Sequence, residues 1–249
     1  MDIKNIKKEF PIFKQKINGK PLVYLDSANS SQKSKIVIDK ISSFYETEYS
    51  NVGRSVHTLA VKATNRFEAT RDKIQKYLNA KHREEIIFTK GATEAINLVA
   101  SSYGKKYIKK GDEVLITELE HHSNYVPWNY LRTDKGAVIK FAQVNKNGDV
   151  EIEEIKKLIT NKTKIIAITH ISNVTGAILP ITKIVDLAKE KNIPVLIDGT
   201  QGAPHSAIDM QKIGCDFYAI SCHKMYGPNG LGILSVSYTH LTLPTKRIV

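Results

Sequence analysis

Short apolar runs alternate with longer amphipathic stretches along most of the chain. Runs of branched and aromatic residues predict strands at residues 23–26, 85–89, 113–117, 137–144, 164–169, 195–198, 216–220 and 231–234. Apolar residues at helical spacing predict helices at residues 33–48, 59–80, 151–159 and 181–191. Strands that alternate with helices imply an α/β fold with a mostly parallel sheet.

Two of the predicted strands end in polar clusters. Asp198 is the last residue of one of them, and the strand over 216–220 runs into Ser221, His223 and Lys224. A lysine at the end of an apolar strand is unusual, because burying its charge costs several kcal/mol unless the charge is paired or neutralised. On its own, Lys224 is better explained as a surface lysine whose stem lies along the strand end.

Asp198 changes this interpretation. Parallel strands joined by a crossover bring their polar ends to one edge of the sheet, so Asp198 and Lys224 are expected to lie together. A lysine that loses its proton easily can form a Schiff base with an aldehyde. A carboxylate can partner a pyridinium nitrogen, so the pair indicates pyridoxal 5′-phosphate (PLP).

Composition excludes several other classes of protein. The chain has 249 residues, of which 41% are hydrophobic and 25% charged, as in ordinary globular proteins. It has no long apolar run for a membrane span and no apolar leader at its N-terminus, so we expect a cytoplasmic protein without membrane association. The net charge of +12 is spread over the whole chain without a nucleic-acid-binding motif, so no nucleic-acid partner is expected.

A metal site is not expected either. Cys215 and Cys222 are too few for a zinc site without other ligands, and we interpret both as core residues. His121 and His122 are adjacent, and neighbours on a strand point to opposite faces, so they would rarely share one ion.

Four sequence strings, in this order, carry a resemblance to a known family. They are EHHSN at 120–124 with VPW at 126–128, THISNVTG at 169–176, DGTQ at 198–201 and SCHKMYGP at 221–228. With them the chain resembles the class V aminotransferase family of fold-type I PLP enzymes, and within it the SufS-like cysteine desulfurases and selenocysteine lyases. The resemblance implies a three-layer α/β/α large domain.

The resemblance also implies roles for individual residues. Lys224 and His121 would be catalytic, with His121 stacked on the cofactor ring. Ala28 and Asn173 would contact the substrate. Cofactor binding would fall to Ala92, Thr93, His121, Asn173, Asp198, Gln201, Ser221, His223 and Lys224.

Several of these residues have simpler explanations in the sequence alone. Thr93 follows a glycine at a predicted helix start, which suits a phosphate but also an ordinary N-cap. Asn173 precedes Gly176 and could form an Asx-turn. Ala28 could belong to a plain connection between two elements.

The resemblance gives out near the end of the chain. We expect an N-terminal segment over 1–20, a PLP-binding domain over 21–235 that is incomplete, and a tail over 236–249 foreign to the family. The family's small C-terminal domain, nucleophilic cysteine and carboxylate-binding arginine would then be missing, which predicts a truncated and weakly active chain.

The implied reaction is a cysteine desulfurase reaction for iron–sulfur cluster assembly, with sulfur leaving L-cysteine as a persulfide on an enzyme cysteine. A sulfur-acceptor protein and a homodimer are implied with it. Selenocysteine lyase acting on L-selenocysteine, another class V reaction and an inactive PLP-binding fragment remain alternatives, because a fold does not determine its chemistry.

Overall fold

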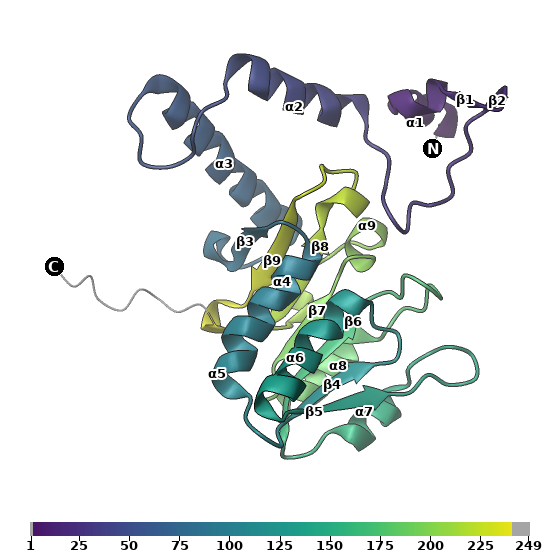
Figure 1. Cartoon of the computed structure of the whole chain (residues 1–249), viewed down its shortest axis with the longest axis vertical. Helices are drawn as coiled ribbons and strands as arrows, with labels where there is room; N and C mark the ends of the chain where they lie inside the picture. Colours follow the sequence, from purple (N-terminus) through teal and green to yellow (C-terminus); the bar gives the residue numbers. More distant parts are fainter. Residues whose placement is uncertain (1, 241–249) are drawn as a thin grey trace.

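The computed structural model describes residues 2–240, in which strands and helices alternate as predicted (Figure 1). The strands are β1 (Lys16–Ile17), β2 (Lys20–Pro21), β3 (Ile86–Thr89), β4 (Glu113–Thr117), β5 (Val138–Ala142), β6 (Thr163–Thr169), β7 (Val195–Asp198), β8 (Phe217–Ser221) and β9 (Gly232–Val236). The helices are α1 (Ile3–Lys8), α2 (Lys35–Thr47), α3 (Thr58–Tyr77), α4 (Ala92–Val99), α5 (Lys105–Tyr107), α6 (Val126–Lys135), α7 (Ile152–Leu158), α8 (Ile181–Lys189), α9 (Gly202–His205) and α10 (Met210–Ile213). In the described range no helix is long and apolar enough to cross a bilayer.

The central sheet has seven strands in the order β3-β9-β8-β7-β6-β4-β5. Strands β8, β7, β6, β4 and β5 are parallel, and β9 runs antiparallel to both of its neighbours. Thr169 pairs with Asp198, and Asp198 pairs with Ala219, so β6, β7 and β8 end at nearly the same level. The polar ends of neighbouring strands therefore meet at one edge of the sheet, as predicted.

Helices cover both faces of the sheet. Its buried strands are therefore apolar at successive positions, since side chains on either face lie in a core. Val114 and Ile116 pack in one cluster with Trp128 of α6 and Ile96 of α4. Leu115 packs in the other cluster, which holds the inward residues of the helices on the opposite face: Ile155, Ile181, Ile184, Val185, Ala188 and Met210. The expected three-layer α/β/α architecture is confirmed.

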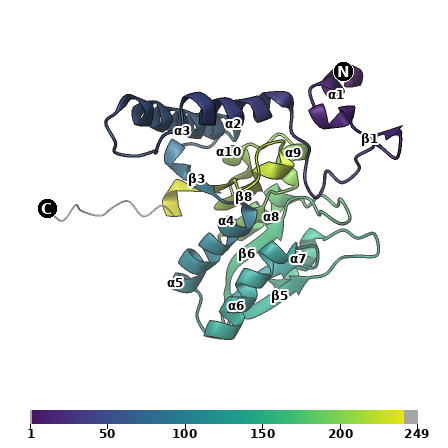
Figure 2. The same ribbon diagram turned by 45° about the horizontal axis from the view of Figure 1, so that its top comes forward.

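The N-terminal part contributes little to this core. Helix α2 forms where helical spacing predicts it, yet none of its residues is buried, and Ile36 is 73% exposed. Figures 1 and 2 show α2 standing away from the sheet. The predicted strand over 23–26 is wrong, because this segment is irregular and finds no partner strand, with Leu25 91% exposed.

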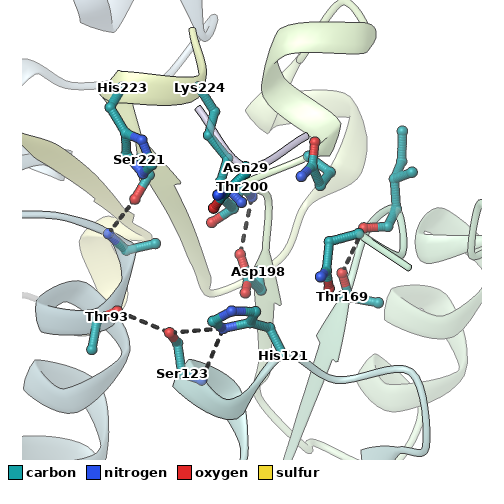
Figure 3. Close-up of a pocket in the computed structure, with 14 residues that line it drawn as sticks. Asn29, Thr93, His121, Ser123, Thr169, Asp198, Thr200, Ser221, His223 and Lys224 are labelled. Atoms are coloured by element: carbon teal, nitrogen blue, oxygen red, sulfur yellow. Dashed lines mark hydrogen bonds between the residues drawn. The ribbon is translucent and has the colours of Figure 1, made fainter. Parts of the chain in front are cut away.

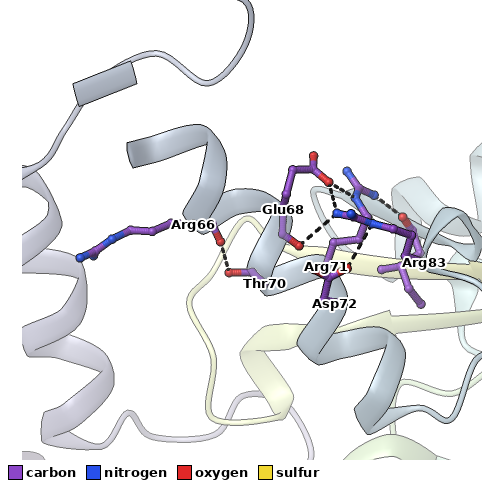
Figure 4. A network of polar contacts seen from close by, with 7 residues as sticks. Arg66, Glu68, Thr70, Arg71, Asp72 and Arg83 are labelled. Atoms are coloured by element: carbon purple, nitrogen blue, oxygen red, sulfur yellow. Dashed lines mark hydrogen bonds and ion pairs between the residues drawn. The ribbon is translucent and has the colours of Figure 1, made fainter. Parts of the chain in front are cut away.

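A polar network joins helix α3 to the edge of the sheet (Figure 4). Glu68 lies 2.6 Å from the Arg83 guanidinium and 3.2 Å from that of Arg71. Asp72 lies 3.1 Å from Arg83, in the 3₁₀ turn η2 (Arg83–Glu85) that precedes β3. Arg71 also donates to the carbonyl of Ile86, so the network fixes the start of β3 against α3.

The C-terminal end of the described chain lies against the domain. Strand β9 continues to Val236, and the 3₁₀ turn η6 (Tyr238–His240) follows it. His240 Nε2 lies 2.6 Å from Asp216, and the Tyr238 N–H donates to Glu85. The prediction that residues 236–249 are foreign to the family stays a prediction, and residues 241–249 lie outside the described residues.

Candidate active site

A cavity of about 210 Å³ lies at the carboxyl ends of β6, β7 and β8 (Figure 3). With the exception of Ala28, every residue predicted for the site lines it: Ala92, Thr93, His121, Asn173, Asp198, Gln201, Ser221, His223 and Lys224. These side chains come from five separate stretches of sequence, and the fold brings them together. Their individual roles stay predictions, which the geometry below supports to different degrees.

Lys224 and Asp198 are neighbours at this edge. Asp198 is the last residue of β7 and is buried, and its Oδ1 accepts the N–H of Thr200 at 3.0 Å. Lys224 ends the 3₁₀ turn η5 (Cys222–Lys224) after β8 and extends toward Asp198 and Thr200 (Figure 3). Burial lowers the pKa of Lys224, and the nearby carboxylates of Asp198 and Asp26 oppose that shift. The amine therefore loses its proton more easily than a surface lysine does.

The first turn of α4 forms one end of the cavity. The Ala92 N–H donates to Ser221 Oγ at 3.0 Å, and Thr93 Oγ1 lies 2.8 Å from Ser123 Oγ. Because the Ser221 oxygen accepts this bond, its own proton stays available to a ligand. Helix N-termini favour anions, so this end of the cavity suits a phosphate. Here the Ala92 N–H is already engaged by Ser221.

A close backbone approach fixes this turn in place. A Cβ added at Gly232 of β9 would meet the Cα of Gly91 at 2.4 Å. Only glycine at 232 lets the strand pass so close to the residue before α4.

His121 holds a defined tautomer. Its Nδ1 accepts the Ser123 N–H at 3.1 Å, so the proton of the neutral ring is on Nε2. His121 is the N-cap of the 3₁₀ turn η4 (His122–Asn124) rather than a strand residue, so the strand argument about His121 and His122 does not apply. In residues 2–240 no group of three His, Cys, Asp or Glu side chains could hold a metal ion.

His223 lies beside the anion end and is held from the N-terminal side. Its Nδ1 lies 3.2 Å from Ser30 Oγ, and its carbonyl oxygen accepts from Ser31 Oγ at 2.9 Å and from Lys33 Nζ at 2.8 Å. Burial, then the charges of Lys224 and Lys33, lower the pKa of the His223 imidazole. A neutral His223 can donate one N–H to an anion from Nε2.

Two amide side chains lie on the remaining wall. Ser172 caps the turn that follows β6, accepting from the N–H groups of Val174 and Thr175, so Asn173 does not form the alternative Asx-turn. Gln201 Nε2 donates to the carbonyl of Ala28 at 2.6 Å. Ala28 thus supports the site through its backbone, and its neighbour Asn29 lines the cavity.

Three other residues of the lining were assigned no role from the sequence, although each lies within one of the four strings. Thr169 ends β6, Ser123 joins Thr93 to His121, and Thr200 follows the predicted Asp198. Thr200 Oγ1 is buried and has no hydrogen-bond partner in residues 2–240. A buried hydroxyl without a partner is costly, so Thr200 marks a position where a ligand would supply the missing bond.

The two cysteines lie outside the cavity lining. Both are buried in the core on one face of the sheet. Burial raises the pKa of the Cys222 thiol to about 11 and that of Cys215 higher still. Neither forms the thiolate that nucleophilic attack requires at neutral pH.

Comparison with known proteins gives a consistent picture. The family model described as aminotransferase class-V matches residues 23–244. A protein of Halalkalibacterium halodurans named "Probable cysteine desulfurase" is 48% identical over 97% of this chain and 59% of its own length. A cysteine desulfurase of Yersinia pseudotuberculosis is 47% identical over 93% of this chain and 57% of its own. The chain thus spans little more than half of these relatives.

Solved structures resemble the fold closely. The cysteine desulfurase CsdA from Escherichia coli superposes with a TM-score of 0.83 at 34% identity, over 95% of this chain and 58% of its own. The apo cysteine desulfurase from Thermococcus onnurineus gives a TM-score of 0.88 at 31% identity, over 95% of this chain and 57% of its own.

Proposed function

Because the chain belongs to the class V aminotransferase family, we propose that it is the PLP-binding part of a cysteine desulfurase. The reaction converts L-cysteine to L-alanine and passes the sulfur to a cysteine thiolate as a persulfide. The observation that carries the proposal is the pairing at one sheet edge of a proton-poor amine, Lys224, with a buried carboxylate, Asp198. The relatives and solved structures named above support the substrate.

The residues of the cavity fit PLP group by group. The Lys224 amine suits the aldehyde, and the Asp198 carboxylate suits the ring nitrogen. The Ser221 hydroxyl, the Thr93 hydroxyl and His223 suit the phosphate, and the flat ring of His121 suits one face of the pyridine. The partnerless hydroxyl of Thr200 is the independent sign that this cavity is built for a polar ligand.

When bound, PLP supplies an electron sink that stabilises negative charge at the substrate Cα. Asp198 holds the ring nitrogen in its protonated form. Lys224 Nζ, as a free amine, would take the proton from the substrate Cα. His121, with the proton of its neutral ring on Nε2, could donate that proton to a group bound in the cavity. Asn173 and Gln201 orient the polar groups at the ring's edge.

The thiolate that takes the sulfur is not one of the two cysteines of this chain. Cys215 and Cys222 are buried, and their thiols are held in the protonated form by raised pKa values. We therefore assign the persulfide to another thiol. A cytoplasmic homodimer that delivers sulfur to an acceptor protein for iron–sulfur cluster assembly belongs to the same proposal.

The test measures alanine and sulfide released from L-cysteine. One protein is the 249-residue chain, and the other is a chimera that adds the C-terminal part of the Halalkalibacterium relative. With a dithiol such as dithiothreitol present to reduce the persulfide, we expect equal amounts of alanine and sulfide from the chimera, little turnover by the chain alone, and none by the chimera with Lys224→Ala. A chimera that binds PLP but releases no alanine would overturn the proposal.

Selenocysteine is an alternative substrate, because residues that bind the cofactor do not by themselves distinguish it from cysteine. Running the assay with L-selenocysteine compares the two values of kcat/KM directly. We expect cysteine to be used, and a chimera active on selenocysteine alone would reassign the enzyme as a selenocysteine lyase.

A further inference from the structure

Trp128, Asn124 and Glu120 are joined by a hydrogen-bond network beside the cavity. In this network each of their bonded atoms can act only as a donor or only as an acceptor. Trp128 Nε1 donates to Asn124 Oδ1 at 3.1 Å, and Asn124 Nδ2 donates to Glu120 Oε2 at 2.7 Å. The other carboxylate oxygen, Oε1, accepts the backbone N–H of Thr169 at 2.9 Å and the Thr117 hydroxyl at 2.6 Å. Trp128 and Asn124 are fully buried, so water cannot replace these partners.

The two ends of this network, the Trp128 indole N–H and the Thr169 backbone N–H, can only donate hydrogen bonds. Asn124 must therefore turn its oxygen toward Trp128 and its NH₂ toward Glu120. Residue 120 must then accept on both of its terminal atoms. The ionised carboxylate meets that requirement, and an amide of the same shape does not. Burial raises the pKa of Glu120 to about 7, so the ionised form is present above that pH.

The position of Glu120 gives this requirement a consequence for the site. Pairing between β4 and β6 extends only as far as Leu115 and Ile166, so the strands are no longer paired where they approach the cavity. The Thr169 N–H would be a buried donor there without Glu120. His121 is the next residue after Glu120, and Thr169 itself lines the cavity.

We propose that Glu120 is a positioning residue that fixes the His121–Ser123 turn against the end of β6, so that the cofactor-facing side chains of the two elements keep one spacing. This role rests on the proposed function, because it matters only if His121 contacts bound PLP. This role would account for Glu120 and Asn124 of the EHHSN string and for Trp128 of the VPW string together.

The test exchanges the donor and acceptor between residues 120 and 124. Glu120→Gln sets the new NH₂ group against the Asn124 NH₂, and Asn124→Asp sets two carboxylates against each other. In the double variant E120Q/N124D, the amide introduced at position 120 donates to the carboxylate introduced at position 124, whose other oxygen still accepts from Trp128. The double variant has the charge and shape of the wild type. Glu153→Gln, at an exposed position of α7, controls for the loss of a carboxylate.

Two readouts are measured on the 249-residue chain at about pH 8.5, above the pKa of about 7 that Glu120 has in the folded chain. One is the dissociation constant for PLP, from its visible absorbance. The other is the emission maximum of Trp128, which is the chain's single tryptophan and reports on the network without any cofactor. Thermal midpoints show whether each variant is folded.

We expect each single variant to weaken PLP binding by about tenfold or more and to shift the Trp128 emission, consistent with a buried donor left unpaired. The double variant should recover both readouts to within about twofold of the wild type, as coupled residues do in a double-mutant cycle. Wild-type PLP affinity in folded E120Q, or a double variant no better than the singles, overturns the role of Glu120. Absence of PLP binding by the wild type overturns the proposed function together with this role, whatever the Trp128 emission shows.

Discussion

The hydroxyl of Ser221 accepts a 3.0 Å hydrogen bond from the backbone N–H of Ala92, which joins the end of β8 to the first turn of α4. These two residues are 129 positions apart in the sequence. The bond leaves the Ser221 proton free to point into the cavity, so one side chain both fixes the anion end and can donate to an anion.

Replacing Ser221 with alanine should therefore weaken PLP binding. Loss of a hydrogen bond to a charged group costs about 1.5–3 kcal/mol, which corresponds to roughly 10- to 100-fold in the dissociation constant. Absorbance titration measures it, with the exposed Ser42→Ala of α2 as the control. Unchanged affinity in S221A would contradict the assignment of this end to the phosphate.

The lowered pKa of Lys224 predicts how PLP capture depends on pH. Only the neutral amine attacks an aldehyde, so the capture rate should reach half its maximum below pH 10.5, the ordinary lysine value. Asp198 attracts the charged amine and so raises its pKa; Asp198→Asn should move the midpoint further down. Stopped-flow absorbance from about pH 6 to 10 measures both midpoints. An upward shift in D198N would contradict the placement of the carboxylate beside the amine.

Glu120 should make folding stability depend on pH in a defined direction. Burial, together with the charge of Asp198, raises its pKa from 4.5 to about 7 against its hydrogen bonds, so between these values the folded chain keeps a proton that the unfolded chain releases. The stability that this proton contributes is complete below pH 4.5 and is lost as the pH rises through about 7. Urea unfolding from about pH 4 to 8 should show the free energy of the wild type, relative to E120Q, falling over this range. A difference independent of pH would contradict the raised pKa.

The two cysteines should be inert in the folded chain. Because burial raises the pKa of both thiols, Ellman's reagent at about pH 8 should label neither of them in the native protein and should label both after denaturation. Rapid labelling of native Cys222 would contradict this and would make Cys222 a candidate for the sulfur nucleophile.

Local pattern predicted the parts of the fold that depend on it alone. The apolar runs that became β7 and β8 are branched and bounded by polar residues, so their strand character and parallel pairing followed directly. The segment over 23–26 has the same local pattern, but pairing depends on a distant partner that does not exist for it among the described residues. Local pattern cannot show that difference.

The residues of the site also differ in whether the sequence alone could predict them. Asp198 and Lys224 were predictable as a pair, because parallel strands bring their polar ends to one edge of the sheet; Lys224 alone was better explained as a surface lysine. The roles of Glu120 and Thr200 depend on contacts with residues far away in sequence, or on a bond that is missing, and no local pattern encodes either. Helix α2 was predicted from apolar residues at helical spacing, and local pattern could not show that none of its residues would be buried.

The central claim is that Lys224 is the amine that captures PLP. The direct measurement is borohydride reduction of the PLP complex, followed by proteolysis and mass spectrometry of the labelled peptides. We predict one pyridoxyl group per chain on Lys224, and none in Lys224→Ala. A label on Lys33, whose Nζ lies 2.8 Å from the carbonyl oxygen of His223, or a label spread over many surface lysines, would contradict the account.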